Sequence, residues 1–336
     1  MKFILLILSL LLLVGCAELN EVEEEVEEEV VEEVVEEVYY IEIESSLIEV
    51  KADPDKGFFW DYFLYVPELS IPEDDRLHLM VSPNNTGKSD DDIEVHKESA
   101  YVAATSRWKN TIAKRLEVPL LVPTFPRPYS KVTTYTHHLD RETMLVESGP
   151  LQRIDIQLIA MIKDAQNQLE LMGLNMEEQI LMNGFSACGT FSNRFTVLHP
   201  HIVKAVASGG NVMPILPINE LDGEKLNYPI GVADIEILTG EEFNYNEYVK
   251  IPQYIYMGEK DDNDPTEHGI AFSRKQAEQI WRLIGRKIDV RWENYKKIYE
   301  EQETSAQFVI FKGKEHFVDP EIIESVIAFF EGVIKE

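Results

Sequence analysis

The strongest constraint on the fold is a serine that lies between an apolar run and a stretch with helical spacing. From residue 179 to residue 189 the sequence reads Gln-Ile-Leu-Met-Asn-Gly-Phe-Ser-Ala-Cys-Gly, with the serine at position 186. Large apolar side chains then recur at helical spacing, at Phe191, Phe195 and Leu198. The pattern predicts a buried strand, a very tight turn and a helix, with Ser186 at the turn.

The residue types around Ser186 suit a strained turn. A side chain at the apex of a strand-to-helix turn needs neighbours without bulk, and Gly184, Ala187 and Gly189 provide them. The first amides of the following helix point toward the turn, and together with the helix dipole they can stabilise an oxyanion. We therefore interpret Ser186 as a candidate nucleophile and the Ala187 amide as a candidate oxyanion donor.

Two polar segments follow predicted strands in the order that such a serine requires. An activated serine needs a base, and the base needs an orienting acid. The strand predicted at 254–257 is followed by a loop with Asp261 and Asp264, and the strand predicted at 308–311 is followed by His316. We expect His316, of the eight histidines, to be the base. Asp261 is the first choice for the acid and Asp264 the second, although the acidic loop also fits a solvated turn. Its lack of a central glycine argues against a calcium loop.

The rest of the chain alternates strand-like and helix-like runs. Strand-like runs cover 39–44, 47–50, 58–66, 77–81, 118–125, 178–183, 203–207, 254–257 and 308–311, and helix-like runs cover 98–116, 153–172, a stretch ending at 198, 272–284, 292–300 and 321–334. The alternation predicts one α/β domain over 39–336, with a mostly parallel sheet covered by helices on both faces. The segment 209–251 interrupts it, as a cap-like insertion over the site or as a surface excursion.

Ser186, Asp261 and His316 with their surroundings resemble the α/β-hydrolase superfamily. The similarity covers about 58–334 and is greatest to secreted esterases, in the neighbourhood of polyhydroxybutyrate depolymerases and feruloyl esterases. It implies an α/β-hydrolase fold and a Ser-Asp-His triad that works through an acyl-enzyme, with no cofactor and no metal.

The resemblance also implies roles for two loops. The loop at 82–87 matches the one that completes the oxyanion hole in the family, which makes the amides of Asn84 and Asn85 candidate second donors. The substrate pocket is expected to be shaped by 125–140, by the segment after 209 and by residues near 317. Tyr129, Tyr135 and His138 are candidate substrate contacts in the first of these.

The N-terminal segment is typical of export. Residues 1–15 form a short positive start and an apolar run of a secretory signal peptide, which ends in Leu-Val-Gly before Cys16. This sequence resembles the lipobox of prokaryotic lipoproteins, so Cys16 is a candidate lipidation site; the alternative is an ordinary secreted protein. Residues 16–38 contain twelve glutamates among valines and no basic residue. We interpret them as an acidic tether rather than a partner-binding coiled coil.

Charge and cysteine content limit the partners. The chain has a formal net charge of −30, and residues 39–336 alone carry 49 acidic and 30 basic side chains. Such a surface repels phosphates, so nucleic acid is not an expected partner, and membrane contact is expected only through the lipid anchor at the cell envelope. With Cys16 lipidated, Cys188 is left without an intramolecular disulfide partner, and stability must come from the core.

Three functions remain open from the sequence. The first is a serine esterase that acts on a small-molecule or polymeric ester. The second is a serine peptidase on the same fold, because the same three groups can cleave amides. The third is a surface-anchored binding lipoprotein that has lost activity. The sequence leaves the oligomeric state and the identity of the substrate open.

Overall fold

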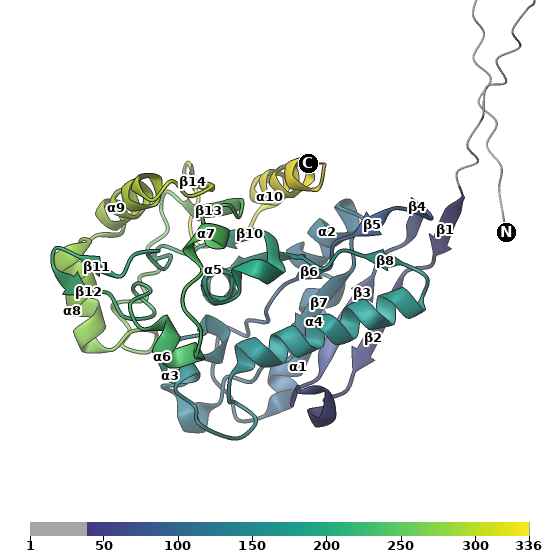
Figure 1. Cartoon of the computed structure of the whole chain (residues 1–336), viewed down its shortest axis with the longest axis horizontal. Coiled ribbons are helices and arrows are strands. Elements are labelled where there is room, and N and C mark those ends of the chain that lie inside the picture. The colour runs from purple at the N-terminus through teal and green to yellow at the C-terminus, as the bar shows by residue number, and fades with distance from the viewer. Residues whose placement is uncertain (1–38, 336) are drawn as a thin grey trace, which may run out of the picture.

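The computed structural model describes residues 39–335, which form an eight-stranded sheet with helices around it (Figure 1). The strand order is β14 (Ala306–Phe311), β13 (Gln253–Gly258), β10 (Val203–Gly209), β9 (Ile180–Phe185), β6 (Met80–Val81), β7 (Leu120–Pro123), β3 (Tyr62–Val66) and β2 (Ser46–Val50). The predicted signal peptide (1–15) and the tether with Cys16 (16–38) lie outside the described residues. Within 39–335 no helix has both the length and the apolar character needed to cross a bilayer.

The sheet is mostly parallel, as predicted. Neighbouring strands from β7 to β14 all pair in parallel, and only the β2–β3 and β3–β7 pairs are antiparallel. Strand β9 lies among the parallel strands and is almost wholly buried, which fits its continuous apolar sequence. Strand β14 forms the edge, pairs with β13 alone and is much more exposed.

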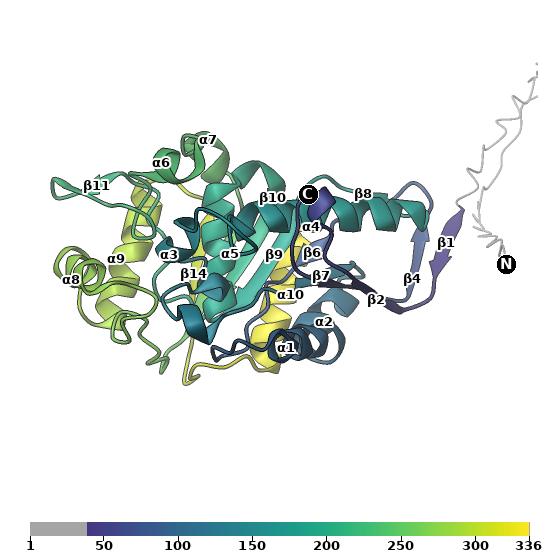
Figure 2. The same cartoon turned by 90° about the horizontal axis from the view of Figure 1, so that it is seen from below.

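Side chains alternate across the sheet and supply two separate cores. Along β3, Tyr62 and Leu64 face one core, and Phe63 and Tyr65 face the other. The first core contains α4 (Ile154–Leu171) and α5 (Ala187–Leu198). The second contains α1 (Ile93–Thr105), α2 (Trp108–Arg115) and α10 (Pro320–Ile334), which group together below the sheet in Figure 2. Both faces are therefore covered, as the predicted architecture requires.

A third core lies beside β13 and β14. It is formed by α8 (Arg274–Leu283) and α9 (Ile288–Glu301), with Trp292 and Tyr295 fully buried against Ile255. Helix α8 begins with a capping box in which the Ser273 hydroxyl accepts from the Gln276 amide and the Gln276 side chain accepts from the Ser273 amide.

The strand expected at 39–44 is present but lies outside the main sheet. Strand β1 (Tyr40–Ile43) pairs with β4 (Leu69–Pro72) in the same antiparallel register that joins β2 to β3. The two pairs are one ribbon interrupted at Pro67, a residue that has no N–H to donate to a partner strand. Two shorter pairs complete the strands: β5 (Arg76–Leu77) with β8 (Asn175–Met176), and β11 (Glu220–Leu221) with β12 (Glu224–Lys225).

The helix predicted at 98–116 is two helices, and this correction has a local cause. Helix α1 begins earlier, where the Asp92 carboxylate accepts from the Glu94 amide, and it ends at Thr105. The Thr105 hydroxyl donates back to the Tyr101 carbonyl, and the Asn110 side-chain amide donates to the carbonyl of Ala104. In a continuous helix the Ala104 carbonyl would accept from the Trp108 amide; the Asn110 side chain bonds it instead, and α2 begins afresh at Trp108.

The irregular segment 209–251 contains a short hairpin and two short helices, α6 (Ile235–Thr239) and α7 (Tyr245–Tyr248). A further short helix, α3 (Arg141–Met144), contacts this segment, because the Arg141 guanidinium donates to the Tyr228 carbonyl and pairs with Asp234. Many apolar side chains of 209–251 are buried in the first and third cores.

Candidate active site

Ser186 occupies a strained turn between β9 and α5. Its φ of 63° and ψ of −131° lie in a region that residues other than glycine rarely adopt. A Cβ added at Gly184 would come within 3.0 Å of the Cys188 carbonyl, and one at Gly189 within 3.0 Å of the Gly209 carbonyl. The glycines around the serine are therefore required by close backbone approach on both sides of the turn.

Cys188 fits the turn because its side chain folds back onto it. Its Sγ lies 3.2 Å from the Phe185 nitrogen, from which it accepts, and 3.0 Å from the Phe185 carbonyl, to which it donates. The close contact that excludes a side chain occurs one residue later, at Gly189. The spacing Gly-Phe-Ser-Ala-Cys-Gly is thus compatible with a serine at the apex.

The three residues predicted as a triad form one continuous hydrogen-bonded chain. His316 Nε2 lies 2.9 Å from Ser186 Oγ, and His316 Nδ1 lies 2.7 Å from Asp261 Oδ2. A carboxylate only accepts, so Nδ1 carries the proton and Nε2 is the acceptor for the serine hydroxyl. The other Asp261 oxygen accepts from the Asn263 amide at 3.1 Å, which fixes the carboxylate, and Asp261 is buried.

The loops that carry Asp261 and His316 are joined through their backbones. The Glu259 amide donates to the Phe311 carbonyl at 2.9 Å, and the Lys260 amide donates to the Lys314 carbonyl at 2.8 Å. Gly258, the last residue of β13, passes so close to the base-carrying loop that a Cβ there would lie within 3.0 Å of the Lys314 carbonyl. The distance between Asp261 and His316 is therefore set by the bonds that join the ends of β13 and β14.

The second-choice acid has a different environment. Asp264 forms an ion pair of 2.5 Å with Arg291, whose side chain is fully buried, and it also accepts from the amide and hydroxyl of Thr266. The carboxylate that contacts His316 is that of Asp261. Of the two acids left open by the sequence, Asp261 is therefore the one placed beside His316.

Of the three predicted oxyanion donors, Ala187 and Asn85 line the space beside Ser186 and Asn84 does not. The first helical hydrogen bond of α5 runs from the Thr190 amide to the Ser186 carbonyl, so the amide of Ala187 precedes the helical pattern and has no partner within the helix. Asn85 lines the space around Ser186. The Asn84 side chain instead bonds both the amide and the carbonyl of Phe125, at 3.1 and 2.8 Å, and so fastens this loop to the end of β7.

Comparison with solved structures identifies the architecture. Poly(aspartic acid) hydrolase-1 from Sphingomonas sp. KT-1 is 14% identical, with a TM-score of 0.56, over 88% of this chain and 100% of that one. A poly(3-hydroxybutyrate) depolymerase from Bordetella parapertussis is 18% identical, with a TM-score of 0.56, over 86% and 90%. The chain has the α/β-hydrolase fold. No protein-family model and no curated protein sequence matches it.

Two pockets open beside Ser186 in this α/β-hydrolase fold. The first, of about 260 Å³, contains Arg127, Tyr135 and His138, and we call it the Arg127 pocket. The second, of about 250 Å³, contains Trp108, Lys109 and His316, and we call it the Trp108 pocket. Ser186 and Asn85 line both, so the serine hydroxyl lies where a substrate could extend in two directions.

The predicted substrate contacts fall into two groups. Tyr135 and His138 line the Arg127 pocket, and their rings stack with centroids 5.2 Å apart. Tyr129 lines neither pocket and is 70% exposed. From the segment 209–251, only Gly210 and Val212 line the Arg127 pocket, while five residues of 263–271 do so.

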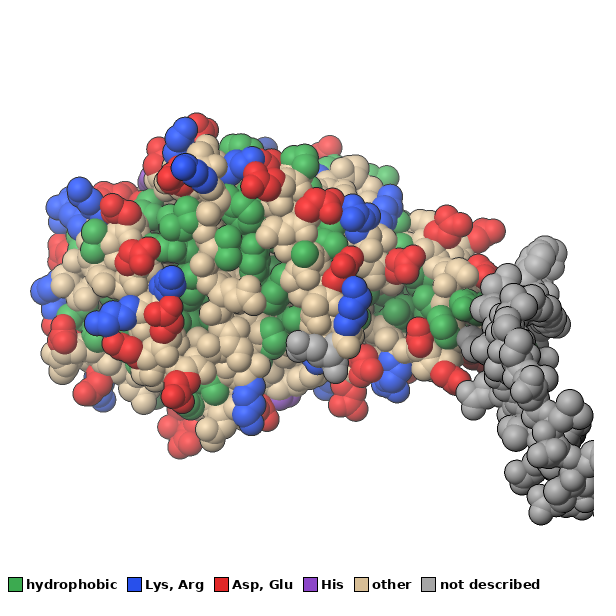
Figure 3. Space-filling view, turned by 90° about the horizontal axis from the view of Figure 1, so that it is seen from above, with side chains coloured by type: hydrophobic (Ala, Val, Ile, Leu, Met, Phe, Trp, Pro, Cys, Tyr) green, Lys and Arg blue, Asp and Glu red, His purple; other side chains and the backbone are tan. Residues whose placement is uncertain are grey.

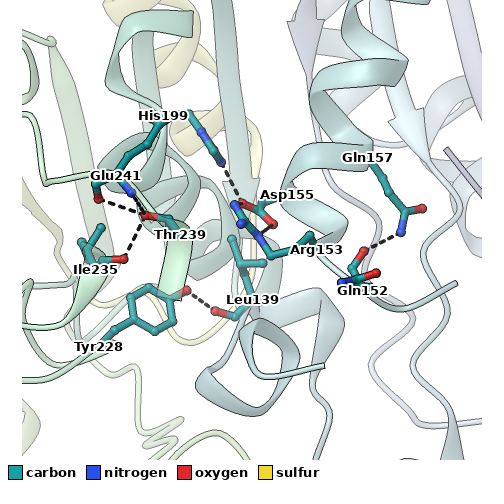
Figure 4. Close-up of polar contacts among 10 residues, drawn as sticks. All are labelled: Leu139, Gln152, Arg153, Asp155, Gln157, His199, Tyr228, Ile235, Thr239 and Glu241. Carbon is teal, nitrogen blue, oxygen red and sulfur yellow. Dashed lines mark hydrogen bonds and ion pairs between the residues drawn. The ribbon is translucent and has the colours of Figure 1, made fainter. Parts of the chain in front are cut away.

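A second histidine and aspartate pair lies in the core and has no serine. His199 Nε2 lies 2.9 Å from Asp155 Oδ2, and Arg153 binds the same carboxylate through two bonds (Figure 4). Burial alone would raise the pKa of Asp155, but the bonds from His199 and Arg153 lower it to about 2. The pair lines neither pocket. It joins the start of α4 to the end of α5 and so supports the helix that follows Ser186.

Sequence reasoning missed four residues that shape this site. Asn263 donates toward His316 Nε2 from 3.1 Å, Gly258 allows the two loops to meet, and Arg127 and Lys109 line the pockets. A usable signal existed for Arg127, because it lies between two prolines directly after a buried strand, at the sheet edge where sites gather. Lys109 lies inside a helical run, where its burial could not be read from the sequence.

Proposed function

We propose that the protein is a serine hydrolase that cleaves carboxylic esters through an acyl-enzyme. The observation that carries the proposal is the continuous chain from Ser186 through His316 to Asp261 at the ends of β9, β14 and β13. A strained serine beside free helix amides is the arrangement that acyl transfer requires.

The proposed reaction has two halves. His316 Nε2 takes the hydroxyl proton as Ser186 Oγ attacks the ester carbonyl, and Asp261 stabilises the imidazolium that forms. The amide of Ala187, and a second amide from Asn85, would bind the oxyanion. His316 then gives its proton to the departing alkoxide. Water, deprotonated by His316, attacks the acyl-enzyme, and the collapse of this second intermediate returns the proton to Ser186 and releases the acid.

Amide cleavage is the second candidate, and one observation favours keeping it. The two structural neighbours named above are a poly(3-hydroxybutyrate) depolymerase and a poly(aspartic acid) hydrolase, so this fold is compatible with attack on esters and on amides. Turnover of matched 4-nitrophenyl esters and 4-nitroanilides of the same acyl group separates the two. We expect the ester to be hydrolysed and the anilide to be left intact.

A fluorophosphonate probe tests whether the serine is activated at all. We expect the wild type to be labelled and Ser186→Ala to be unlabelled, because only a serine paired with a base reacts with the probe. Ser192→Ala is the matched control, since its hydroxyl donates to the Cys188 carbonyl within α5 and lines neither pocket. Folded wild type that resists labelling would instead support an inactive, binding role.

We also propose that the domain is exported and held at the cell envelope through lipid on Cys16. The support is the sequence of residues 1–38 alone. Partition into detergent after expression in a bacterial host tests this. Full-length wild type is expected in the detergent phase and Cys16→Ser in the aqueous phase, whereas equal partition of the two would contradict the anchor.

A further inference from the structure

The basic residues around Ser186 have an unusual electrostatic environment. Among residues 39–335, four basic side chains are more than nine-tenths buried: Lys109, Arg127, Arg194 and Arg291. Arg291 is paired with Asp264, but the other three have no ion pair. Burying an unpaired charge is costly, so proteins seldom retain one without a use. All three unpaired cations lie at the site: Lys109 and Arg127 line the two pockets, and Arg194 contacts His138 from behind.

The Arg127 guanidinium is held rigidly but is not neutralised. The Arg127 backbone is fixed at both ends, because its amide donates to His96 Nε2 and its carbonyl accepts from the Asp90 amide. Its guanidinium carbon lies 3.7 Å from the centroid of the Tyr135 ring. The Nε atom of Arg127 is buried and has no acceptor among the described residues. A pre-positioned guanidinium that has no carboxylate partner is a typical receptor for a carboxylate.

A second donor belongs to the same pocket. Tyr135 stacks between Arg127 and His138, and Arg194 Nη1 donates to His138 Nδ1 at 2.9 Å. An imidazole nitrogen that accepts from a guanidinium carries no proton, so the proton of His138 lies on Nε2, which is a donor. Burial, together with the charges of Arg194 and Arg127, holds the pKa of His138 well below its usual range. The pocket therefore contains a cation and a neutral N–H donor.

No acidic side chain of the described residues lines the Arg127 pocket, so none competes with a bound carboxylate for Arg127. Among the described residues, neither aspartate nor glutamate lines the Arg127 pocket or the Trp108 pocket. The nearby Asp140 lines neither pocket, and its Oδ1 accepts from the amide and hydroxyl of Thr143 and from the Tyr135 amide. By contrast, acidic and basic side chains are interspersed on the outer face in Figure 3. The local excess of positive charge is thus opposite in sign to the net charge of the chain.

The direction of the reaction assigns the pockets to the two halves of an ester. The departing alkoxide must receive its proton from His316, which lines the Trp108 pocket and not the Arg127 pocket. We infer that the Arg127 pocket receives the acyl half and binds a carboxylate on it, through the Arg127 guanidinium and the His138 Nε2–H. The substrate class is then a half-ester of a dicarboxylic acid, or an acyl chain that ends in a carboxylate. This inference rests on the ester hydrolysis proposed above.

Paired substrates test the inference. Mono-4-nitrophenyl esters of glutaric, adipic and pimelic acids are compared with counterparts in which the free carboxyl is a primary amide. We expect the wild type to favour the acid over the amide in kcat/KM by on the order of tenfold or more at the best length, as for a charge-assisted bond. Arg127→Gln should remove most of this ratio and Arg127→Lys should keep part of it. The exposed Arg286→Gln, in neither pocket, should leave the ratio unchanged.

Two results overturn the inference. Equal kcat/KM for acid and amide in the wild type excludes a carboxylate subsite, and an unchanged ratio in Arg127→Gln excludes Arg127 as its receptor. Both leave ester hydrolysis in place, because turnover is still seen.

Binding to Ser186→Ala is measured as well, by calorimetry with monomethyl adipate and dimethyl adipate. The binding measurement decides the case in which the wild type turns over no ester. If monomethyl adipate then binds more strongly than dimethyl adipate, and adding Arg127→Gln removes this difference, the subsite is upheld and hydrolysis is refuted. Absence of this binding refutes the subsite too.

Discussion

Gly258 touches the loop that carries His316, because a Cβ on Gly258 would lie within 3.0 Å of the Lys314 carbonyl. The contact joins the end of β13 to the loop after β14, and it places the imidazole between the carboxylate of Asp261 and the hydroxyl of Ser186. The geometry of the site thus depends on a residue that has no side chain and takes no part in the proposed reaction.

Replacing Gly258 with alanine is therefore expected to lower kcat. The added methyl group must push the Lys314 carbonyl away, and a displacement of about 1 Å at a catalytic group can cost on the order of 100-fold. Hydrolysis of a neutral 4-nitrophenyl ester measures the loss. Gly332→Ala is the control, because Gly332 lies within α10 with no atom near its added Cβ. It should keep full activity and gain up to about 1 kcal/mol of stability.

Asp261 and Asp264 should give opposite phenotypes when each is changed to asparagine. Asp261→Asn allows the wrong tautomer of His316, and kcat is expected to fall on the order of 10⁴-fold with little change in Tm. Asp264→Asn leaves the buried Arg291 without its charged partner and should lower stability by about 3 kcal/mol. The folded fraction should remain active. A larger loss of kcat in Asp264→Asn than in Asp261→Asn would reverse the assignment of the acid.

The two asparagines of the oxyanion loop should also differ. Asn85→Ala keeps the backbone amide, so we expect kcat within about threefold of the wild type if that amide is the donor. Asn84→Ala removes both bonds to the Phe125 backbone, which leaves buried polar groups unsatisfied and costs about 2 kcal/mol. Release of the loop should then lower kcat by about tenfold or more, which is part of the loss caused by removing one oxyanion donor. Urea unfolding and ester turnover provide the two measurements.

The Asp155 site predicts a pH dependence of stability. Its pKa is about 2 in the folded protein, below the ordinary 3.8, so the folded state favours the carboxylate. The stabilisation is fully present above pH 4 and is lost as the pH falls toward 2, and its pH-dependent part is about 2 kcal/mol. The free-energy difference between the wild type and Asp155→Asn should shrink by this amount between pH 5 and pH 2. A constant difference would mean that Asp155 is not stabilised as a carboxylate.

The elements that depend on local pattern were predictable from the sequence. Strand β9, the turn at Ser186 and helix α5 follow from an apolar run, glycine spacing and a helical repeat. The positions of Asp261 and His316 follow from a general property of parallel sheets, whose strand ends meet at one edge. The choice between Asp261 and Asp264 did not follow, because it depends on Arg291, a residue 27 positions away whose burial is a tertiary property.

Other features could not be predicted from the sequence because they depend on bonds that compete with regular secondary structure. The break between α1 and α2 occurs where the Asn110 side chain bonds the Ala104 carbonyl, which a continuous helix would have used. The separation of β1 from the main sheet depends on Pro67, which divides one antiparallel ribbon into the pairs β1–β4 and β2–β3. The positive pockets were hidden for a related reason, since the composition of the chain is acidic and only the fold gathers unpaired cations at one place.

His316, the proposed base, follows the outermost strand of the sheet, whereas Ser186, the proposed nucleophile, follows one of the most protected strands. Strand β14 has a single neighbour and is partly exposed, so it should separate from β13 at a lower free-energy cost than that of melting the whole domain. Detachment of β14 would separate the imidazole of His316 from Ser186 and Asp261 while the first and second cores stay packed. Gentle warming is thus expected to switch turnover off before far-UV circular dichroism changes, and cooling should restore it.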